Sequence, residues 1–266
     1  IMLINTEADG TLIWSQSIGG ENEDYGTDLL ELDDGNIILT GYTYSYGQGA
    51  DDLFIIKFTP AGDTLWTRLY GEESHEHSYS IDYTNDSGYI ISGFTKSFTN
   101  GYYDAYVIKT DQEGHVDWSA VYGGDQNDRA RMLRKVEDGY LIAGGCESAG
   151  AGLMDLMLLK INFDGKLLWS KTYGTPLDET TNYMRLTEDG GCLIVGFSNE
   201  QDSPSNRDLI AVKTDGQGDT LWTGLWGTND LSEFGTAGIE ARDGGFTLVG
   251  NSGKDNEILL LKLGRH

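Results

Sequence analysis

The hydrophobic positions of this chain follow one pattern that recurs from end to end. One unit has four short runs rich in Ile, Leu, Val, Thr and aromatic residues, separated by Asp-Gly or similar turns: DYGTDLLELDDG, NIILTGYTYS, DDLFIIKFTPAG and DTLWTRLYG. The second and third runs are almost continuously apolar, which predicts strands covered on both faces. The fourth run alternates, as a half-exposed outer strand does. No run has a helical period, so the pattern predicts an all-β protein.

Tryptophan residues mark the period of the repeat. Each follows a glycine by four residues and precedes another by five, and their spacings are 52, 52, 51 and 53: Trp14, Trp66, Trp118, Trp169 and Trp222. Four-stranded antiparallel units of this length, each needing neighbours on both sides, are typical of β-propeller blades. We therefore predict a single domain, 1–266, with repeats at about 8–60, 61–112, 113–163, 164–216 and 217–266.

The two ends of the chain predict how the propeller closes. The run TLIWSQSI (11–18) would supply the outer strand of the last blade, beside EILLLKL (257–263). That pairing closes a ring of five four-stranded blades and leaves residues 1–7 as a surplus strand. This strand either adds at an edge or indicates that the chain is cut from a longer array. Because IMLINTEADG mirrors LMLLKINFDG (156–165), the chain opens inside a motif, without a signal peptide, like a mature or excised piece.

The order of motifs within a repeat is W…YG, an acid, DGG, GxTxS and D…IIK. It resembles that of the bacterial β-propeller-repeat proteins, and the resemblance covers essentially the whole chain. It implies a propeller and a secreted or cell-surface protein. That family often has no assigned activity, and its blade number varies.

Charge and cysteine content narrow the classes of partner. The chain has 43 acidic and 18 basic residues, a formal net charge of -25. Such a surface repels phosphate backbones, so we expect no nucleic-acid partner, whereas cations, basic proteins and neutral sugars stay open. No segment approaches the roughly 18 apolar residues that span a membrane. Two cysteines exclude a disulfide scaffold and a four-Cys zinc site, and we expect both to be free thiols.

Features present in every repeat are assigned to the scaffold. The tryptophans are interpreted as packing anchors between blades. An acid after each YG is expected to cap backbone N–H groups: Asp24, Glu76, Asp128, Glu179 and Glu233. A second acid stands five residues before a lysine, as part of the polar framework of each blade: Asp52, Asp104, Asp155, Asp208 and Glu257 before Lys57, Lys109, Lys160, Lys213 and Lys262.

Loop variability predicts one functional end. The connections that lead into each blade, and those after each second strand, differ from repeat to repeat and emerge at the same end of an up-and-down blade. We call this end the variable-loop face, and we expect function there. Aromatic residues gather in its loops in the first two blades: Tyr44, Tyr46, Phe98, Tyr102 and Tyr103, with Tyr42 and Phe94 close by in sequence. They suit sugar stacking or a protein contact, or they simply plug the blades.

Basic and histidine residues supply two further candidate sites. Four arginines lie on the inner strands of blades three and four, where they would hold a carboxylate or sulfate, or neutralise nearby acids: Arg129, Arg131, Arg134 and Arg185. His75 and His77 share a face of a strand and could meet one metal ion, although exposed loop histidines are usually just solvated. No cofactor is predicted, and a divalent cation stays open.

Catalytic motifs are mostly absent, with no GxSxG elbow, HExxH pair or phosphate-binding glycine loop. We therefore expect a non-catalytic, extracellular or surface propeller of a bacterium or archaeon that binds a glycan or a protein partner. Two alternatives stay open. One is a polysaccharide-cleaving enzyme that uses carboxylates near the channel, such as Asp28 and Asp82. The other is a structural module of a larger surface stalk or filament.

Overall fold

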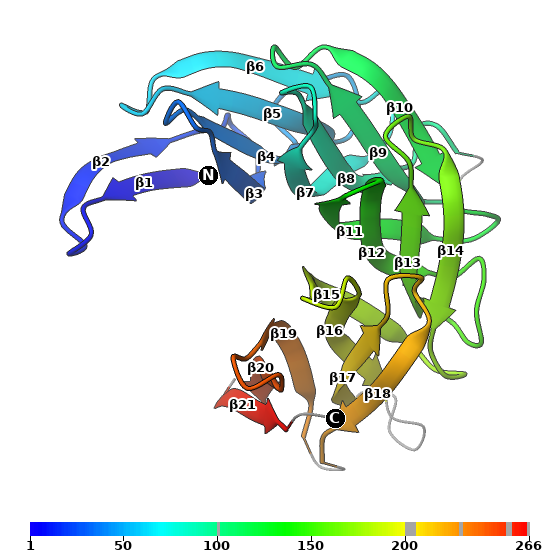
Figure 1. Ribbon diagram of the computed structural model, residues 1–266. Coiled ribbons are helices and arrows are strands. Elements are labelled where there is room, and N and C mark those ends of the chain that lie inside the picture. Colours follow the sequence, from blue (N-terminus) through cyan, green and yellow to red (C-terminus); the bar gives the residue numbers. More distant parts are fainter. Residues whose placement is uncertain (100–101, 200–205, 229–230, 254–256, 265–266) are drawn as a thin grey trace. The chain divides into compact units, whose positions relative to one another are not determined.

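The computed structural model describes residues 1–99, 102–199, 206–228, 231–253 and 257–264. These residues form two compact units, Ile1–Tyr122 and Gly123–His266, and each is described by itself. All regular structure in the described residues is β (Figure 1), as the hydrophobic pattern predicts. The described residues contain no helix long and apolar enough to span a bilayer.

The first unit holds one two-stranded sheet and two four-stranded antiparallel sheets, each in chain order. The hairpin is β1 (Met2–Thr6) and β2 (Leu12–Ser17). The first complete blade is β3 (Asp24–Glu31), β4 (Ile37–Thr43), β5 (Asp52–Phe58) and β6 (Thr64–Tyr70). The second is β7 (Glu76–Tyr83), β8 (Tyr89–Thr95), β9 (Asp104–Thr110) and β10 (Val116–Tyr122).

The second unit holds two four-stranded sheets and one three-stranded sheet, again antiparallel and in chain order. The third blade is β11 (Asp128–Val136), β12 (Gly139–Cys146), β13 (Asp155–Ile161) and β14 (Leu167–Tyr173). The fourth is β15 (Glu179–Leu186), β16 (Cys192–Asn199), β17 (Arg207–Thr214) and β18 (Thr220–Trp226). The last sheet is β19 (Glu233–Glu240), β20 (Phe246–Ser252) and β21 (Glu257–Leu263). Four-stranded antiparallel sheets of this kind are compatible with a propeller-like fold.

The N-terminal hairpin differs from the predicted closure. β1 pairs with β2 from Met2↔Ser17 to Thr6↔Leu12, with a register shift before the last pair. β13 and β14 pair in the same way, from Met157↔Thr172 to Ile161↔Leu167. Residues 1–18 therefore pair with each other as a third and a fourth strand do, in a two-stranded sheet of their own. In the sheets of the described residues β21 pairs with β20 alone. No closed ring is found among them, and the count of five blades stays a prediction.

Burial follows the predicted order of strands. The second and third strands β8 and β9 are buried along their whole length, while the fourth strands β6, β10, β14 and β18 share one alternating pattern of exposure. This is the difference between strands covered on both faces and outer strands covered on one. Apolar side chains of neighbouring sheets form the cores, for example Ile38 and Ile55 with Ile81 and Ile91.

The tryptophans anchor one sheet onto the next, as predicted. Trp14, Trp66 and Trp169 each pack on a glycine in the turn between the third and fourth strands of the following sheet. A Cβ on Gly218 would lie 2.8 Å from the ring of Trp169, and one on Gly114 would lie 3.1 Å from the ring of Trp66. Both glycines have a φ of +78°, which side-chain-bearing residues rarely adopt. The regular spacing of glycine and tryptophan in the sequence therefore reflects a contact between neighbouring blades.

Candidate functional site

The acid after each YG is a scaffold residue, as predicted. Glu179 is fully buried and accepts hydrogen bonds from the Thr175 backbone N–H (3.1 Å), the Thr175 hydroxyl (2.7 Å) and the Ser198 hydroxyl (2.7 Å). The equivalent acids accept from the backbone N–H at the same turn: Asp24, Glu76, Asp128 and Glu233. These carboxylates fix the loop that leads into each first strand.

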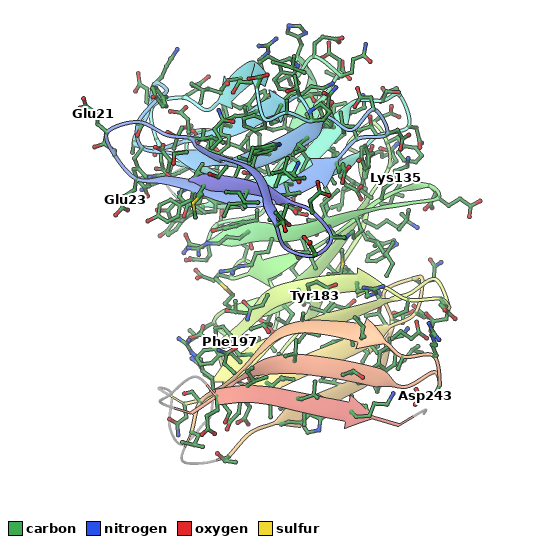
Figure 2. The ribbon with its side chains drawn as sticks, turned by 90° about the vertical axis from the view of Figure 1, so that its left-hand side faces the viewer. Glu21, Glu23, Lys135, Tyr183, Phe197 and Asp243 are labelled. Atoms are coloured by element: carbon green, nitrogen blue, oxygen red, sulfur yellow. The ribbon has the colours of Figure 1, made fainter. Side chains whose placement is uncertain are left out.

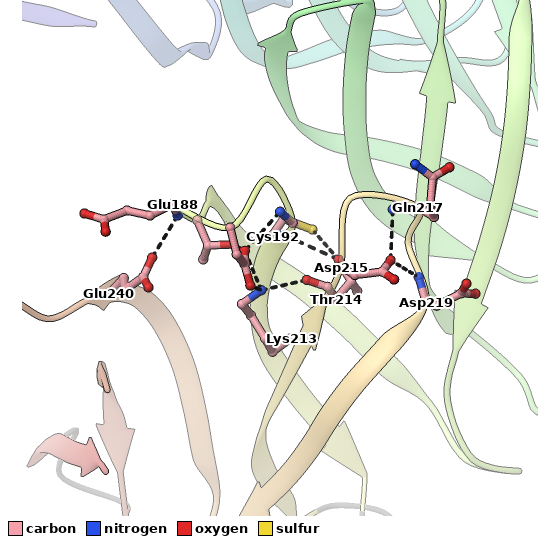
Figure 3. A network of polar contacts seen from close by, with 11 residues as sticks. Glu188, Cys192, Lys213, Thr214, Asp215, Gln217, Asp219 and Glu240 are labelled. Atoms are coloured by element: carbon pink, nitrogen blue, oxygen red, sulfur yellow. Dashed lines mark hydrogen bonds and ion pairs between the residues drawn. The ribbon is translucent and has the colours of Figure 1, made fainter. Parts of the chain in front are cut away.

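The end of the blades opposite the variable loops is held by lysine–aspartate pairs. Lys213 donates to Asp189 at 2.7 Å and to the carbonyl of Thr214 at 2.7 Å (Figure 3), and it is almost fully buried. The same pair recurs as Lys109–Asp86, Lys160–Asp138 and Lys262–Asp243. Partial burial favours a higher pKa for the Asp189 carboxyl, but hydrogen bonds from Lys213, Thr187 and the Gly191 N–H together with the charge of Lys213 lower the pKa to about 2. These recurrent contacts make this end structural.

The two ends of the strands therefore differ in kind. Within the second unit, Phe197 lies at one end of the strands, and Lys135 and Asp243 lie at the other (Figure 2). The end with Phe197 is where the variable loops emerge. The other end carries the short turns and the lysine–aspartate pairs.

In the first unit, the variable-loop end gathers aromatic rings into a continuous series. Tyr25 stacks on Tyr42 with ring centroids 4.8 Å apart, and Tyr42 stacks on His77 at 3.6 Å with an interplanar angle of 5°. His77 contacts Phe94 at 4.5 Å, and Phe94 contacts Tyr103 edge-on at 4.7 Å. We call these five residues the aromatic ladder. It joins strands and loops of two neighbouring blades.

A buried carboxylate lies beneath the aromatic ladder. Asp51 is 1% exposed, and its two oxygens contact His75 Nδ1 and His77 Nε2. The Asp51 carbonyl also accepts a hydrogen bond from the Glu76 N–H at 3.0 Å, which joins the loop of one blade to the first strand of the next. The described part of the chain contains no group of three or more His, Cys, Asp or Glu residues that could hold a metal ion. His75 and His77, the candidate metal ligands, both contact Asp51, and metal binding by this pair stays a prediction.

Four predicted aromatic residues are exposed in the loops of this unit, and Tyr44 contacts the ladder. Tyr44 is 39% exposed and meets Tyr42 edge-on at 6.2 Å. Tyr46, Phe98 and Tyr102 are also exposed. An open groove of about 730 Å³ runs beside Tyr44, and Glu21, Asn22, Glu23 and Ala50 complete its lining. The ring and hydroxyl of Tyr44 thus share one hollow with the carboxylates of Glu21 and Glu23.

The tyrosine hydroxyls of this region stay protonated well above neutral pH. Burial, followed by the charges of neighbouring groups, raises the pKa of Tyr42 to about 12. Burial and the nearby Asp51 also raise the pKa of Tyr44. Both hydroxyls can therefore donate as well as accept hydrogen bonds.

The predicted arginines are not brought to one point. Arg129 lies second in β11 and Arg134 lies seventh, near the opposite end of that strand, where its Nη1 donates to the Leu133 carbonyl at 2.6 Å. Arg131 falls at a register shift of the same strand, and Arg185 is exposed near the end of β15. A single anion site made by all four has no support. Asp28, a candidate channel carboxylate, accepts from the Ile81 N–H and the Ser80 hydroxyl, and so links two blades.

Sequence reasoning missed Asp51. It stands immediately before Asp52, a recurrent framework acid, and looks like part of the same motif. The available signal was positional, because the other four repeats have Tyr103, Met154, Arg207 and Asn256 at this place in the sequence.

Comparison with known proteins gives no family for the chain, since no family model matches it. It is 24% identical over 194 residues to the regulatory protein FlaEY of Caulobacter vibrioides, which covers 62% of this chain and 20% of that protein. The chain thus spans about a fifth of that relative's length.

The solved structures that match are distant. A protein from Leishmania major has a TM-score of 0.39 and 12% identity over 91% of this chain and 85% of its own. A structure described as a 6-phosphogluconolactonase from Bacteroides fragilis has a TM-score of 0.37 and 14% identity over 88% of this chain and 83% of its own. Values this low carry no argument about function.

Proposed function

We propose that the chain is a non-catalytic, extracellular or cell-surface β-propeller of a bacterium or archaeon that binds a glycan through its variable-loop face. The aromatic ladder carries this proposal. Stacked rings with protonated hydroxyls suit sugars, which offer C–H faces to rings and hydroxyls to polar tips. Carboxylates of the adjoining groove supply further acceptors for sugar hydroxyls. A protein partner could insert a side chain into the same groove, so the test must distinguish glycan binding from protein binding.

We further propose that the propeller has five blades and closes by pairing β2 with β21. In all four complete blades a lysine of the third strand lies opposite the tryptophan of the fourth: Lys57↔Trp66, Lys109↔Trp118, Lys160↔Trp169 and Lys213↔Trp222. In the N-terminal hairpin Asn5 is opposite Trp14. If β21 took the place of β1 beside β2, Lys262 would lie opposite Trp14 as in the complete blades, which supports this closure. A disulfide formed between Lys262→Cys and Trp14→Cys, without dimerisation, would test it.

The binding proposal is tested with glycan and protein arrays. Wild type is compared with Tyr44→Ala/Tyr102→Ala/Tyr103→Ala and with Leu65→Ala/Val116→Ala, which truncates two side chains that are each 51% exposed on outer strands. We expect the tyrosine variant to lose glycan binding at least tenfold, since it removes one ring of the ladder and two exposed rings, and each ring that contacts a sugar contributes about 0.5–1.5 kcal/mol. The control variant should bind as wild type does. Absence of glycan binding, or equal loss in both variants, would refute the proposal.

A further inference from the structure

Three repeat positions meet at the variable-loop end of two junctions between blades, one in each unit. The first is the residue after the recurrent glycine of the second strand, such as Gly41. The second is the residue before the recurrent acid of the third strand, such as Asp52. The third is the residue after the recurrent acid that begins the first strand of the next blade, such as Glu76. In the first unit they are Tyr42, Asp51 and His77, which contact one another. In the second unit the same positions of the fourth and last sheets hold Phe197, Arg207 and Phe234.

The second set is an arginine held between two phenyl rings. The Arg207 guanidinium carbon lies 4.4 Å from the ring centroid of Phe197 and 5.0 Å from that of Phe234, and the two rings meet edge-on at 5.3 Å. Both distances are within the range of a cation–π contact. All three residues are half-buried. The rings therefore fix the guanidinium without using its N–H groups.

Arg207 has no acidic partner among the described residues, in a chain with 43 acidic and 18 basic residues. The adjacent Asp208 points elsewhere, because a Cβ on Gly227 would lie 1.8 Å from its Oδ1. At the equivalent place in the first unit, Asp51 is paired with two imidazoles. A guanidinium held between two rings, with no acid of the described residues at its planar edge, fits the two oxygens of a carboxylate.

We propose that Phe197, Arg207 and Phe234 form a subsite for a carboxylate-bearing sugar, a uronate, of the bound glycan. This rests on the proposed glycan-binding function. The guanidinium would hold the carboxylate in a bidentate ion pair, while the rings contact the apolar face of the sugar. The strongly negative net charge repels densely charged polyanions, so the subsite accepts isolated carboxylates and not sulfated chains.

Arginine side-chain NMR tests the subsite directly. The Nε–H signal of Arg207, assigned by its loss in Arg207→Lys, is followed while glucuronate, glucose or sulfate is added at equal ionic strength. We expect glucuronate alone to shift it. No shift with glucuronate, or an equal shift with sulfate, overturns the proposal whatever the array result, because this readout does not depend on the aromatic ladder.

Binding to a uronate-containing oligosaccharide and to its carboxyl-reduced form gives the second readout. Arg207→Gln should weaken binding of the uronate form about ten- to a hundredfold, since hydrogen bonds to charged groups contribute about 1.5–3 kcal/mol, and leave the reduced form unchanged. Arg242→Gln is the matched control, because Arg242 is exposed at the short-turn end of the same unit. The subsite is overturned if Arg207→Gln weakens binding of the uronate and reduced forms equally. It is also overturned if Arg207→Gln and Arg242→Gln weaken binding of the uronate form equally. Neither result contradicts the proposed glycan binding.

Discussion

Removal of the buried carboxylate of Glu179 should destabilise the second unit strongly. Glu179 accepts one backbone and two hydroxyl hydrogen bonds at 2.7–3.1 Å and is fully buried. In Glu179→Ala the hydroxyl of Ser198 can turn toward the carbonyl of Asn199, 3.3 Å away. The backbone N–H of Thr175 cannot turn and is left without an acceptor.

The magnitude follows from these losses. One orphaned backbone donor costs about 1–3 kcal/mol, and the space left by the truncated side chain adds to this. We expect about 3 kcal/mol in the free energy of unfolding, or roughly a hundredfold in the folded-to-unfolded ratio. Glu179→Gln keeps the shape and one acceptor, so it should cost less.

Urea denaturation followed by tryptophan fluorescence measures the change, with Glu240→Ala as the control. Glu240 is also the acceptor of a single backbone hydrogen bond, from the Glu188 N–H at 3.0 Å, but at an exposed site. Water replaces that bond, so the control should lose less than about 1 kcal/mol. If Glu179→Ala and Glu240→Ala lower the free energy of unfolding equally, the buried recurrent acids do not stabilise the blade loops in the way proposed.

Three further predictions concern other parts of the scaffold. Hydrogen bonds from Lys109 lower the pKa of Asp86 to about 2. The ionised carboxylate therefore stabilises the fold fully above about pH 4, and this stabilisation is lost as the pH falls toward 2. In Asp86→Asn the free energy of unfolding should no longer fall with pH through this carboxyl between about pH 4 and 2. Burial raises the pKa of Cys146 to about 12 and that of Cys192 to about 11, so a thiol reagent at pH 8 should label both free thiols in urea and neither in the folded protein. A Cβ on Gly196 would lie 1.8 Å from a backbone carbonyl oxygen, so Gly196→Ala should cost more than about 3 kcal/mol, and an unchanged urea midpoint would refute the close approach.

Much of the fold could be predicted because the position of each strand in its sheet depends on the local pattern of apolar residues. Continuous apolar runs identified the buried strands, alternation identified the outer strands, and the glycine–tryptophan spacing identified a contact between blades. The N-terminal hairpin was harder. Residues 1–18 satisfy the pattern of a third and fourth strand, but the same fourth strand also suits β21, and local pattern does not choose between two apolar partners.

The candidate site was predicted only in part, for a physical reason. Tyr44 and Tyr103 are aromatic residues in variable loops, which the sequence displays directly. The contacts of Asp51 with His75 and His77 arise from the packing of one blade on the next, and nothing local in the sequence encodes them. Arg207 was missed similarly, since its two phenyl partners are distant in the chain. An alignment of the repeats places Asp51 and Arg207 at the same position, where their charges distinguish them from the uncharged residues of other repeats.

The three-residue junction at the variable-loop end separates folding from recognition. The same three repeat positions form it in both units with different residues, so point substitutions there can alter chemistry while the buried acids, glycine contacts and lysine pairs elsewhere keep the blades together. Gene duplication of one repeat would therefore create a fresh junction ready to diverge. An ancestral array of this type can broaden the range of molecules it recognises without inventing a new architecture.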